Sequence, residues 1–313
     1  WEISTFFGNS VSLPSYTPSI ADNFFAWPNF VIPELHRDYN FPKVIPVLFT
    51  GSQAPNYPWR NRIDRIVSQR YPALHSPHFG FQWQKGKPSA WSFLEGEKYA
   101  QLINSAWVAP TCGTISNEVV RKHFEIPACS TCLLTQKTAA LEAAGFADLV
   151  NCVFAGDDDV LDKLEWLFAN PDEFNRIIKA GKELVDSRHT IEQRDQVFQW
   201  YTLHQKLKPA QRIVQPGSFL PLTIVDEQSG IRNVHANSNG VDRLLMKQGD
   251  ERLRLGNYGE AEKLYRQCLN YQQPDIPEAR FRLTVCLLHK GDAKAALASL
   301  REQFPSHRLV NEQ

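Results

Sequence analysis

The sequence lacks an excess of charge of either sign. Its 34 Lys and Arg residues balance 34 Asp and Glu residues, so the formal net charge is zero. A chain without a basic excess has no bulk electrostatic attraction for nucleic acid or for an acidic membrane surface. We therefore expect no nucleic-acid partner, and any anion-binding site must be local.

Long apolar runs are also missing. No uninterrupted apolar stretch approaches the roughly 18 residues of a membrane span, and no basic segment precedes a shorter one, so we expect neither a transmembrane segment nor a signal peptide. Trp1 stands where Met is expected, which we interpret as an N-terminus that is not that of the gene. The 313 residues, 42% hydrophobic and 22% charged, predict a globular chain of about two domains.

Cysteine is sparse, and its spacing does not suggest a disulfide framework. Six cysteines in a long chain are typical of reduced, buried thiols in a cytoplasmic protein. Cys129-Ser-Thr-Cys132 is formally a C-x-x-C pair, but without a second pair or nearby histidines it predicts neither a zinc site nor a redox motif. The cysteines are Cys112, Cys129, Cys132, Cys152, Cys268 and Cys286.

No G-x-G-x-x-G follows any predicted strand, which disfavours a dinucleotide-dependent enzyme. Instead, short apolar runs alternate with amphipathic segments, the pattern of a parallel sheet with helices on both faces. We predict an α/β fold with a Rossmann-like parallel sheet. The predicted strands cover residues 44–50 (starting at or after Pro46), 74–79, 106–109, 132–135 and 150–154, and the predicted helices cover about 59–70, 96–104, 137–144 and 160–168.

The segments around this lobe have a different character. Residues 1–40 predict irregular connecting structure with a short strand at 30–32, and residues 208–240 predict a linker with one strand at 222–225. Asn170-Pro171 marks a further helix start, and Thr190 with Gln193 predicts a capping box. The domain prediction is therefore a connection (1–40), a lobe (41–207), a linker (208–240) and a helical tail (241–313).

The tail carries an internal repeat. A spacing of 35 residues separates Gly256 from Gly291 and Ala261 from Ala296. This spacing and the flanking Leu and Tyr residues resemble tetratricopeptide repeats, whose period is about 34 residues. The resemblance implies that the tail captures a protein partner, mediates self-association or packs on the lobe.

The most informative stretch is Thr111–Thr135. A small-residue loop through Gly113 and Thr114 leads to Ser116, which we predict to be the N-cap of a helix that ends before Pro127. Four polar residues of this predicted helix fall at i, i+3, i+4 and i+7 and so share one face. They are Glu118, Arg121, Lys122 and Glu125. The face is either a solvated ladder of ion pairs or a site.

Two turns favour the site. The loop before the predicted helix presents free N–H groups, and Arg121 and Lys122 add charge, so the stretch predicts a diphosphate seat. A second turn, Thr50-Gly51, ends a strand and precedes a helix whose first turn carries Arg60 and Arg62. Cations there oppose the helix dipole, which favours a bound anion near Arg60 over solvated side chains.

The string Arg-Lys-His-Phe-Glu-Ile-Pro-Ala-Cys, residues 121–129, followed by an apolar strand, resembles the C-terminal domain of GT-B glycosyltransferases, in a divergent branch similar to spore-protein-type glycosyltransferase-like domains. The resemblance covers roughly residues 40–205. It implies that Glu125 binds the ribose of a nucleotide sugar. The second Glu of the retaining pattern would lie at position 117, where this chain has Asn117.

The resemblance implies a glycosyltransferase that takes its sugar from a nucleoside-diphosphate sugar and uses no metal or other cofactor. Arg60, Arg121 and Lys122 would neutralise the leaving diphosphate. The backbones of Thr50-Gly51 and Gly113-Thr114 would line the groove. The acceptor, whether glycan, lipid-linked glycan or protein, is not predicted.

Two histidines and a run of three aspartates are further candidate site residues. His78 and His123 are the nearest candidates for a catalytic base, but we interpret each as a packed histidine. Asp157, Asp158 and Asp159 predict an N-cap cluster rather than a metal site. The alternative to an enzyme is a non-catalytic scaffold that keeps a degenerate sugar-nucleotide lobe and binds a partner through its repeats.

Overall fold

The computed structural model describes residues 5–51, 56–76, 94–236, 240–270 and 277–301. The chain divides into two compact units. The sheet unit holds residues 1–53, 59–113 and 117–238, and the helical unit holds residues 54–58, 114–116 and 239–313.

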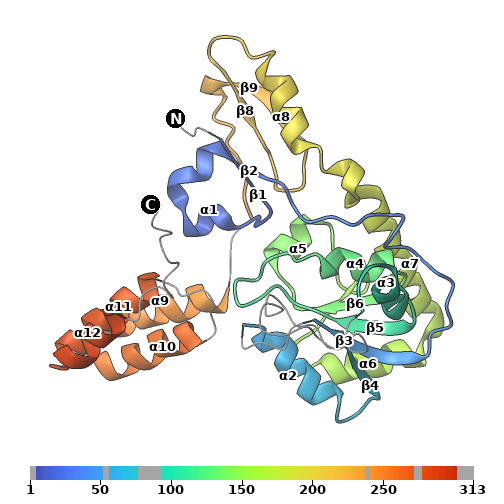
Figure 1. The fold of residues 1–313 in the computed structure, drawn as a ribbon, viewed down its shortest axis with the longest axis horizontal. Helices are drawn as coiled ribbons and strands as arrows, with labels where there is room; N and C mark the ends of the chain where they lie inside the picture. Colours follow the sequence, from blue (N-terminus) through green and yellow to red (C-terminus); the bar gives the residue numbers. More distant parts are fainter. Residues whose placement is uncertain (1–4, 52–55, 77–93, 237–239, 271–276, 302–313) are drawn as a thin grey trace, which may run out of the picture. The chain divides into compact units, whose positions relative to one another are not determined.

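The sheet unit is built on five parallel strands in the order β4-β3-β5-β6-β7 (Figure 1). The strands are β3 (Ile45–Thr50), β4 (Ala73–Ser76), β5 (Ala106–Pro110), β6 (Cys132–Thr135) and β7 (Val153–Phe154). The predicted α/β class and Rossmann-like parallel sheet are confirmed. The chain adds β4 on one side of β3 and β5 on the other, so a crevice is expected at the carboxyl ends of β3 and β5.

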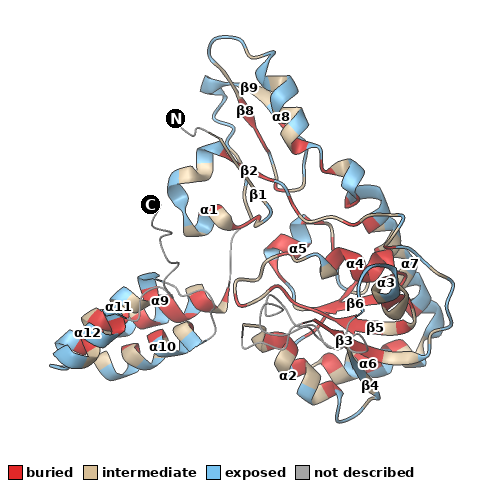
Figure 2. Ribbon diagram, in the orientation of Figure 1, coloured by how far each residue is buried: buried red, intermediate tan, exposed pale blue. Residues whose placement is uncertain are grey.

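From the first strand of this sheet to the hairpin that follows it, the described part of the sheet unit contains seven α-helices. They are α2 (Pro58–Val67), α3 (Gly96–Asn104), α4 (Lys122–Ala128), α5 (Ala139–Ala143), α6 (Val160–Ala169), α7 (Pro171–Arg188) and α8 (Gln196–His204), with the short 3₁₀ turn η3 (Ile191–Gln193) before α8. The prediction for 96–104 is confirmed, as is the capping box of Thr190 and Gln193. Figure 2 shows buried residues along most strands of the sheet and through most of α4, whereas helices such as α2 combine buried and exposed positions.

Apolar spacing explains which faces are buried. In α2, Trp59, Ile63 and Val67 recur every four residues, and all three are buried. Full burial of one such aliphatic side chain contributes about 1.5–3 kcal/mol. Phe124 of α4 and Phe146 are also fully or almost fully buried, with ring centroids 6.1 Å apart. The core therefore fixes α2 and α4, which carry the cationic side chains of the predicted site.

The segments on either side of the lobe are more ordered than predicted. Residues 5–40 contain a parallel pair, and residues 208–236 contain a hairpin with a second strand that the sequence did not reveal. These elements are β1 (Phe6–Gly8), α1 (Leu13–Tyr16), η1 (Pro18–Asn23), β2 (Phe24–Ala26), β8 (Gln211–Val214), β9 (Thr223–Asp226) and η4 (Glu227–Ser229).

Long-range contacts hold these short strands, which is why local periodicity misses them. Gln215 accepts a hydrogen bond from Ala26 N (2.7 Å) and donates one to Ala26 O (3.1 Å). Phe25 packs with Ile213 and Leu222 in one apolar cluster. The strand predicted at 30–32 was wrong, since only an isolated bridge joins Val31 to Thr190.

The helical unit contains α9 (Val241–Arg254), α10 (Tyr258–Asn270), α11 (Pro277–His289) and α12 (Ala293–Arg301). Gly256 and Gly291, the pair predicted to be equivalent, both have positive φ, 73° and 80°. Ala261 and Ala296, the second predicted pair, are both buried in the same cluster. The predicted repeat thus has a structural counterpart in two helix-turn-helix pairs.

All six cysteines are free and buried, as predicted. Within the described residues, no helix combines the length and apolar character that a bilayer crossing requires.

Candidate functional site

Two cationic side chains converge where β3 ends. Lys122 Nζ and Arg60 Nη1 each lie 3.2 Å from the carbonyl oxygen of Thr50, to which both donate a hydrogen bond. Arg60 comes from α2 and is 3% exposed, whereas Lys122 begins α4. The structure therefore brings together four of the residues predicted from sequence, Thr50, Gly51, Arg60 and Lys122, and we call this group the cationic seat.

Gly51 makes the close approach of Lys122 feasible. Its φ is +96°, a conformation that side chains other than glycine rarely adopt. A Cβ atom added to Gly51 would lie 1.7 Å from Lys122 Nζ and 3.4 Å from Arg60 Nη1. Glycine is thus required both by the turn and by the amine that lies against it.

The positive charges of Lys122 and Arg60 repel each other in the cationic seat. Burial, together with the neighbouring Arg60 guanidinium, lowers the pKa of Lys122 to about 8, while the Glu125 carboxylate acts in the opposite direction. The Thr50 carbonyl oxygen carries only a partial negative charge, so it does not compensate the positive charges of both side chains. An anion placed between them would relieve the repulsion and raise the pKa of Lys122.

Glu125 lies between two groups of unequal exposure, Arg121 and His36. Its Oε1 is 3.2 Å from Arg121 Nε, and the Glu125 side chain is 9% exposed against 59% for Arg121. The same oxygen is 3.7 Å from His36 Nε2. Of the predicted ladder, the pair Arg121–Glu125 exists, with Arg121 on the exposed side of Glu125.

Sequence patterns did not identify His36 as part of the site. The histidine belongs to residues 1–40, which we predicted to be connecting structure, and lies 89 positions before Glu125. Its Nδ1 accepts a hydrogen bond from Ile32 N (3.2 Å), so the proton of the neutral ring is on Nε2, facing the carboxylate. Burial lowers the pKa of His36, which keeps the ring neutral.

The predicted start of the helix was wrong. Helix α4 begins at Lys122 and includes Pro127, and Ser116 is not its N-cap. Asn117 has a positive φ of 55°, and the Glu118 carboxylate accepts hydrogen bonds from the Ser10 and Ser12 hydroxyls. These tertiary contacts hold Glu118 off the helix, so the predicted four-residue face does not form.

Asn117 and Gly113 have structural roles in this turn. The Asn117 side chain accepts a hydrogen bond from Gln136 Nε2. A Cβ atom on Gly113 would lie 1.5 Å from Glu118 O, so glycine permits two backbone segments to pack. Thr114 belongs to the helical unit, where its Oγ1 accepts a hydrogen bond from Ser116 N at 3.3 Å.

The interpretation of His123 as a packed side chain is confirmed. It is 1% exposed, its Nδ1 accepts a hydrogen bond from Val120 N (3.0 Å), and its Nε2 lies 3.3 Å from Thr135 Oγ1. Burial lowers its pKa to about 3, so it is neutral at physiological pH. His78, the second candidate base, lies outside the described residues.

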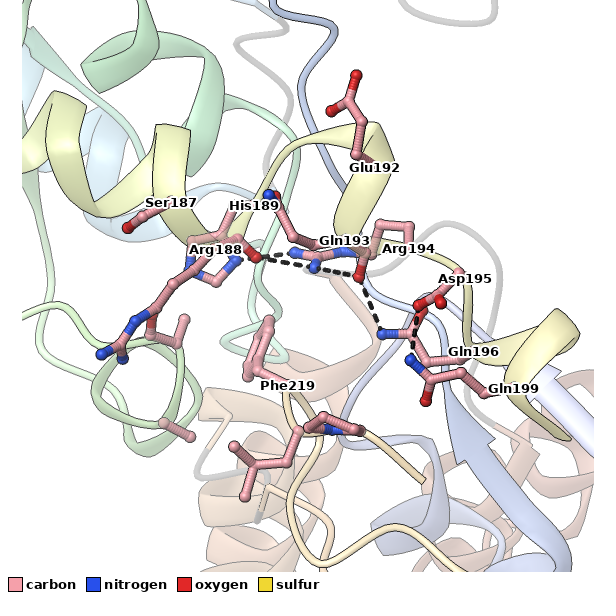
Figure 3. A pocket seen from close by; sticks show the side chains of 14 residues that line it. Ser187, Arg188, His189, Glu192, Gln193, Arg194, Asp195, Gln196, Gln199 and Phe219 are labelled. Atoms are coloured by element: carbon pink, nitrogen blue, oxygen red, sulfur yellow. Dashed lines mark hydrogen bonds between the residues drawn. The ribbon is translucent and has the colours of Figure 1, made fainter. Parts of the chain in front are cut away.

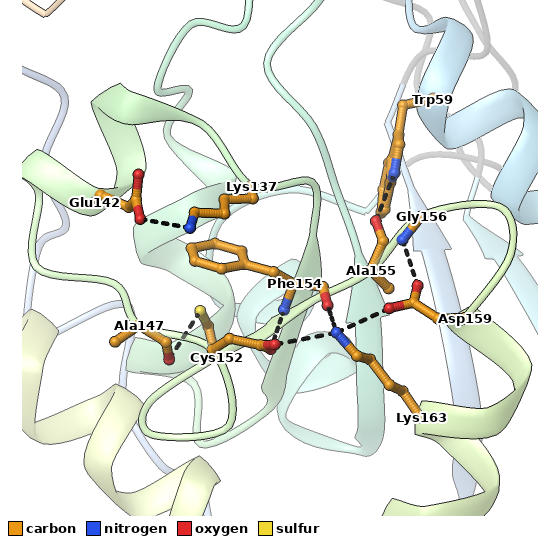
Figure 4. A network of polar contacts seen from close by, with 11 residues as sticks. Trp59, Lys137, Glu142, Ala147, Cys152, Phe154, Ala155, Gly156, Asp159 and Lys163 are labelled. Carbon is orange, nitrogen blue, oxygen red and sulfur yellow. Dashed lines mark hydrogen bonds and ion pairs between the residues drawn. The ribbon is translucent and has the colours of Figure 1, made fainter.

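A separate polar network lies at the carboxyl ends of β6 and β7 (Figure 4). In this network the Asp159 carboxylate accepts a hydrogen bond from Gly156 N (2.7 Å) and forms an ion pair with Lys163 at 3.0 Å. Asp157 pairs with Arg62 at 2.6 Å, so the Arg62 guanidinium already has a carboxylate partner. No group of three or more His, Cys, Asp or Glu side chains within the described ranges is arranged to hold a metal ion.

The two units match different protein families. A family profile described as "Glycosyl transferase-like" matches residues 59–199, and a tetratricopeptide repeat profile matches residues 246–305. Both resemblances predicted from sequence are therefore confirmed. No curated protein sequence matches the chain significantly.

Solved structures of similar fold include the Anabaena protein Alr3699/HepE in complex with UDP-glucose. It is 13% identical, with a TM-score of 0.50, over 65% of this chain and 64% of HepE. This chain thus spans less than two thirds of HepE. A glycosyltransferase from Rickettsia africae is 11% identical, with a TM-score of 0.49, over 66% of this chain and 64% of its own.

Proposed function

Residues 59–199 form a glycosyl transferase-like domain and residues 246–305 contain tetratricopeptide repeats, and on this premise we propose that the chain transfers a sugar from a nucleoside-diphosphate sugar to an acceptor. The observation that carries the proposal is the cationic seat, where Lys122 and Arg60 share one carbonyl oxygen beside Gly51. The two positive charges beside one carbonyl oxygen are complementary to the negative charge of a diphosphate.

In the proposed reaction the bond between the sugar and the β-phosphate oxygen breaks, and negative charge grows on the diphosphate. Lys122 and Arg60 would stabilise that charge where it develops, which lowers the barrier as well as binding the donor. Their fixed positions on α2 and α4 mean that little reorganisation accompanies the step.

Glu125 is proposed to hold the ribose. Its Oε1 faces Arg121 and His36, so Oε2 is the oxygen left to accept hydrogen bonds from a vicinal diol. Arg121, being largely exposed, would orient Glu125 rather than contact the phosphates.

HepE was solved with UDP-glucose, which makes uridine nucleotides the first donors to test here. Because the match leaves more than a third of HepE uncovered, the acceptor and the residue that activates it are not assigned.

The test is thermal shift of the full chain with UDP, GDP and their sugars. We expect stabilisation by at least one nucleotide, a weaker response in Lys122→Met, and an unchanged response in Lys179→Met, which alters an exposed lysine of α7. If no nucleotide stabilises the wild-type chain, the non-catalytic scaffold becomes the better account, with the repeats as its binding surface.

A further inference from the structure

A pocket of about 500 Å³ lies in the sheet unit between the end of α7 and the start of α8 (Figure 3). Its walls come from the end of α5, the turn from Ser187 to Gln199, and the loop of Phe219, Leu220 and Pro221. None of the residues of the cationic seat lines it. Its volume falls in the range of pockets that hold small molecules.

Arg194 and His189, which line the pocket, have their hydrogen bonds satisfied within the protein. Arg194 donates to the carbonyl oxygens of Pro28, Asn29, Arg188 and Gln193, and its Nη2 lies 2.8 Å from His189 Nδ1. His189 Nε2 in turn donates to Ala144 O at 2.8 Å. Arg194 and His189 therefore shape the pocket, but their N–H groups are all used within the protein and do not donate to a ligand.

The polar groups that remain are acceptors on Gln196, Asp195 and Glu192 and one donor group, the exposed Arg188 guanidinium. Gln196 is 3% exposed and lines the pocket; its Nε2 donates to Gln193 O (3.3 Å), but its Oε1 has no hydrogen-bond partner among the described residues. Asp195 Oδ1 accepts from Gln199 Nε2 (2.6 Å), which orients the carboxylate and leaves Oδ2. Glu192 adds a second, exposed carboxylate at the rim.

An apolar wall faces these acceptors. Phe219 lies across the pocket from the turn that carries Gln193 to Gln199 (Figure 3), and its ring packs edge-on against His189, with centroids 5.5 Å apart. Leu220 and Pro221 extend this surface toward solvent, and both are exposed.

Charge narrows the class of ligand. The two lining guanidinium groups, Arg188 and Arg194, balance the two lining carboxylates, Glu192 and Asp195, while burial and Arg194 hold His189 neutral with a pKa of about 3. A balanced lining favours neither an anion nor a cation. A neutral ligand that donates several hydrogen bonds on one side and presents C–H groups on the other fits both walls.

We propose that this pocket is a binding site for a neutral saccharide. The sugar hydroxyls donate to Gln196 Oε1 and Asp195 Oδ2, and a C–H face of the ring lies on Phe219. The site is separate from the proposed donor site and does not depend on it.

The test uses the full chain on an array of neutral, sulfated and sialylated oligosaccharides. We expect binding of at least one neutral glycan, reduced at least tenfold by Asp195→Ala and by Gln196→Leu. Asp172→Ala, which removes an exposed carboxylate at the far end of α7, is the matched control and leaves binding intact. Asp195 is exposed, so its variant keeps the test valid should Gln196→Leu fail to fold.

Lys122→Met separates the two proposals, because it weakens the nucleotide response and leaves glycan binding unchanged. Absence of any neutral glycan signal, binding only to charged glycans, or binding that Asp195→Ala and Gln196→Leu both leave unchanged would overturn the saccharide site.

Discussion

His36 Nε2 lies 3.7 Å from Glu125 Oε1, on the buried side of a carboxylate whose other neighbour, Arg121, is exposed. The hydrogen bond from Ile32 N to His36 Nδ1 fixes the tautomer, so the ring presents a proton to Glu125. A residue from the N-terminal segment thereby orients the group proposed to hold the ribose.

We predict that His36→Ala weakens nucleotide binding about tenfold, or roughly 1.4 kcal/mol, because the Glu125 carboxylate loses the polar Nε2 group that lies 3.7 Å from it on its buried side. His36→Gln, which retains an N–H donor, should recover much of the loss. Isothermal titration with UDP measures both constants. Equal affinities for the alanine variant and the wild type would show that Glu125 needs no support from His36.

A pH dependence of donor binding follows from Lys122. Its pKa is about 8 in the free protein, so the amine loses its charge as the pH rises through 8, and a bound diphosphate favours the charged form. Affinity for UDP should therefore be full below about pH 7 and fall as the pH rises past 8. Titrations from pH 6.5 to 9.5 test this, and Lys122→Met should show a flatter profile.

Acid should destabilise the sheet unit through two buried histidines. The pKa values of His123 and His189 are both about 3 in the folded chain, below the ordinary 6.5, because burial disfavours the charged ring. Between these pH values the unfolded chain binds protons that the folded chain does not. Stability is therefore complete above pH 6.5 and is lost as the pH falls, by up to about 2.7 kcal/mol per pH unit for the pair.

Urea unfolding at pH 7 and pH 5 measures this loss. His189→Asn should reduce the difference between the two pH values, whereas His204→Asn, on an exposed position of α8, should leave it unchanged. A difference that both variants preserve would place the acid sensitivity elsewhere.

Gly51 and Gly96 form a matched pair for a test of the cationic seat. Both have positive φ, +96° and +57°, but a Cβ atom meets Lys122 Nζ at 1.7 Å only at Gly51, with nothing within 4 Å at Gly96. Each alanine variant should lose about 1–2 kcal/mol of stability from backbone strain. Gly51→Ala alone should also displace Lys122 and lower UDP affinity at least tenfold, and a comparable loss in Gly96→Ala would contradict the assigned role of Gly51.

Much of the fold could be predicted because its signals are local. Alternating apolar runs and helices identify the parallel sheet, and the matching positions of Gly256 and Gly291 identify the repeated turn of the tail. The turn at Gly51 could be placed because a glycine ends an apolar run of the length of a buried strand, with the next helix following later in the chain.

The failures share a different cause. Glu118 leaves the predicted helix because Ser10 and Ser12, more than 100 positions away, bind its carboxylate. β1, β2 and β8 are three or four residues long and depend on contacts such as Gln215 with Ala26. His36 reaches Glu125 through the path of the chain, which no spacing in the sequence encodes.

The central claim is that Lys122, Arg60 and Glu125 hold one nucleoside diphosphate between them. A crystal structure of the chain with UDP tests it most directly. We predict phosphate oxygens within hydrogen-bond distance of Lys122 Nζ and Arg60, and a ribose hydroxyl on Glu125 Oε2. A nucleotide bound elsewhere, or a cationic seat that stays unchanged and empty at saturating UDP and GDP, would contradict the account.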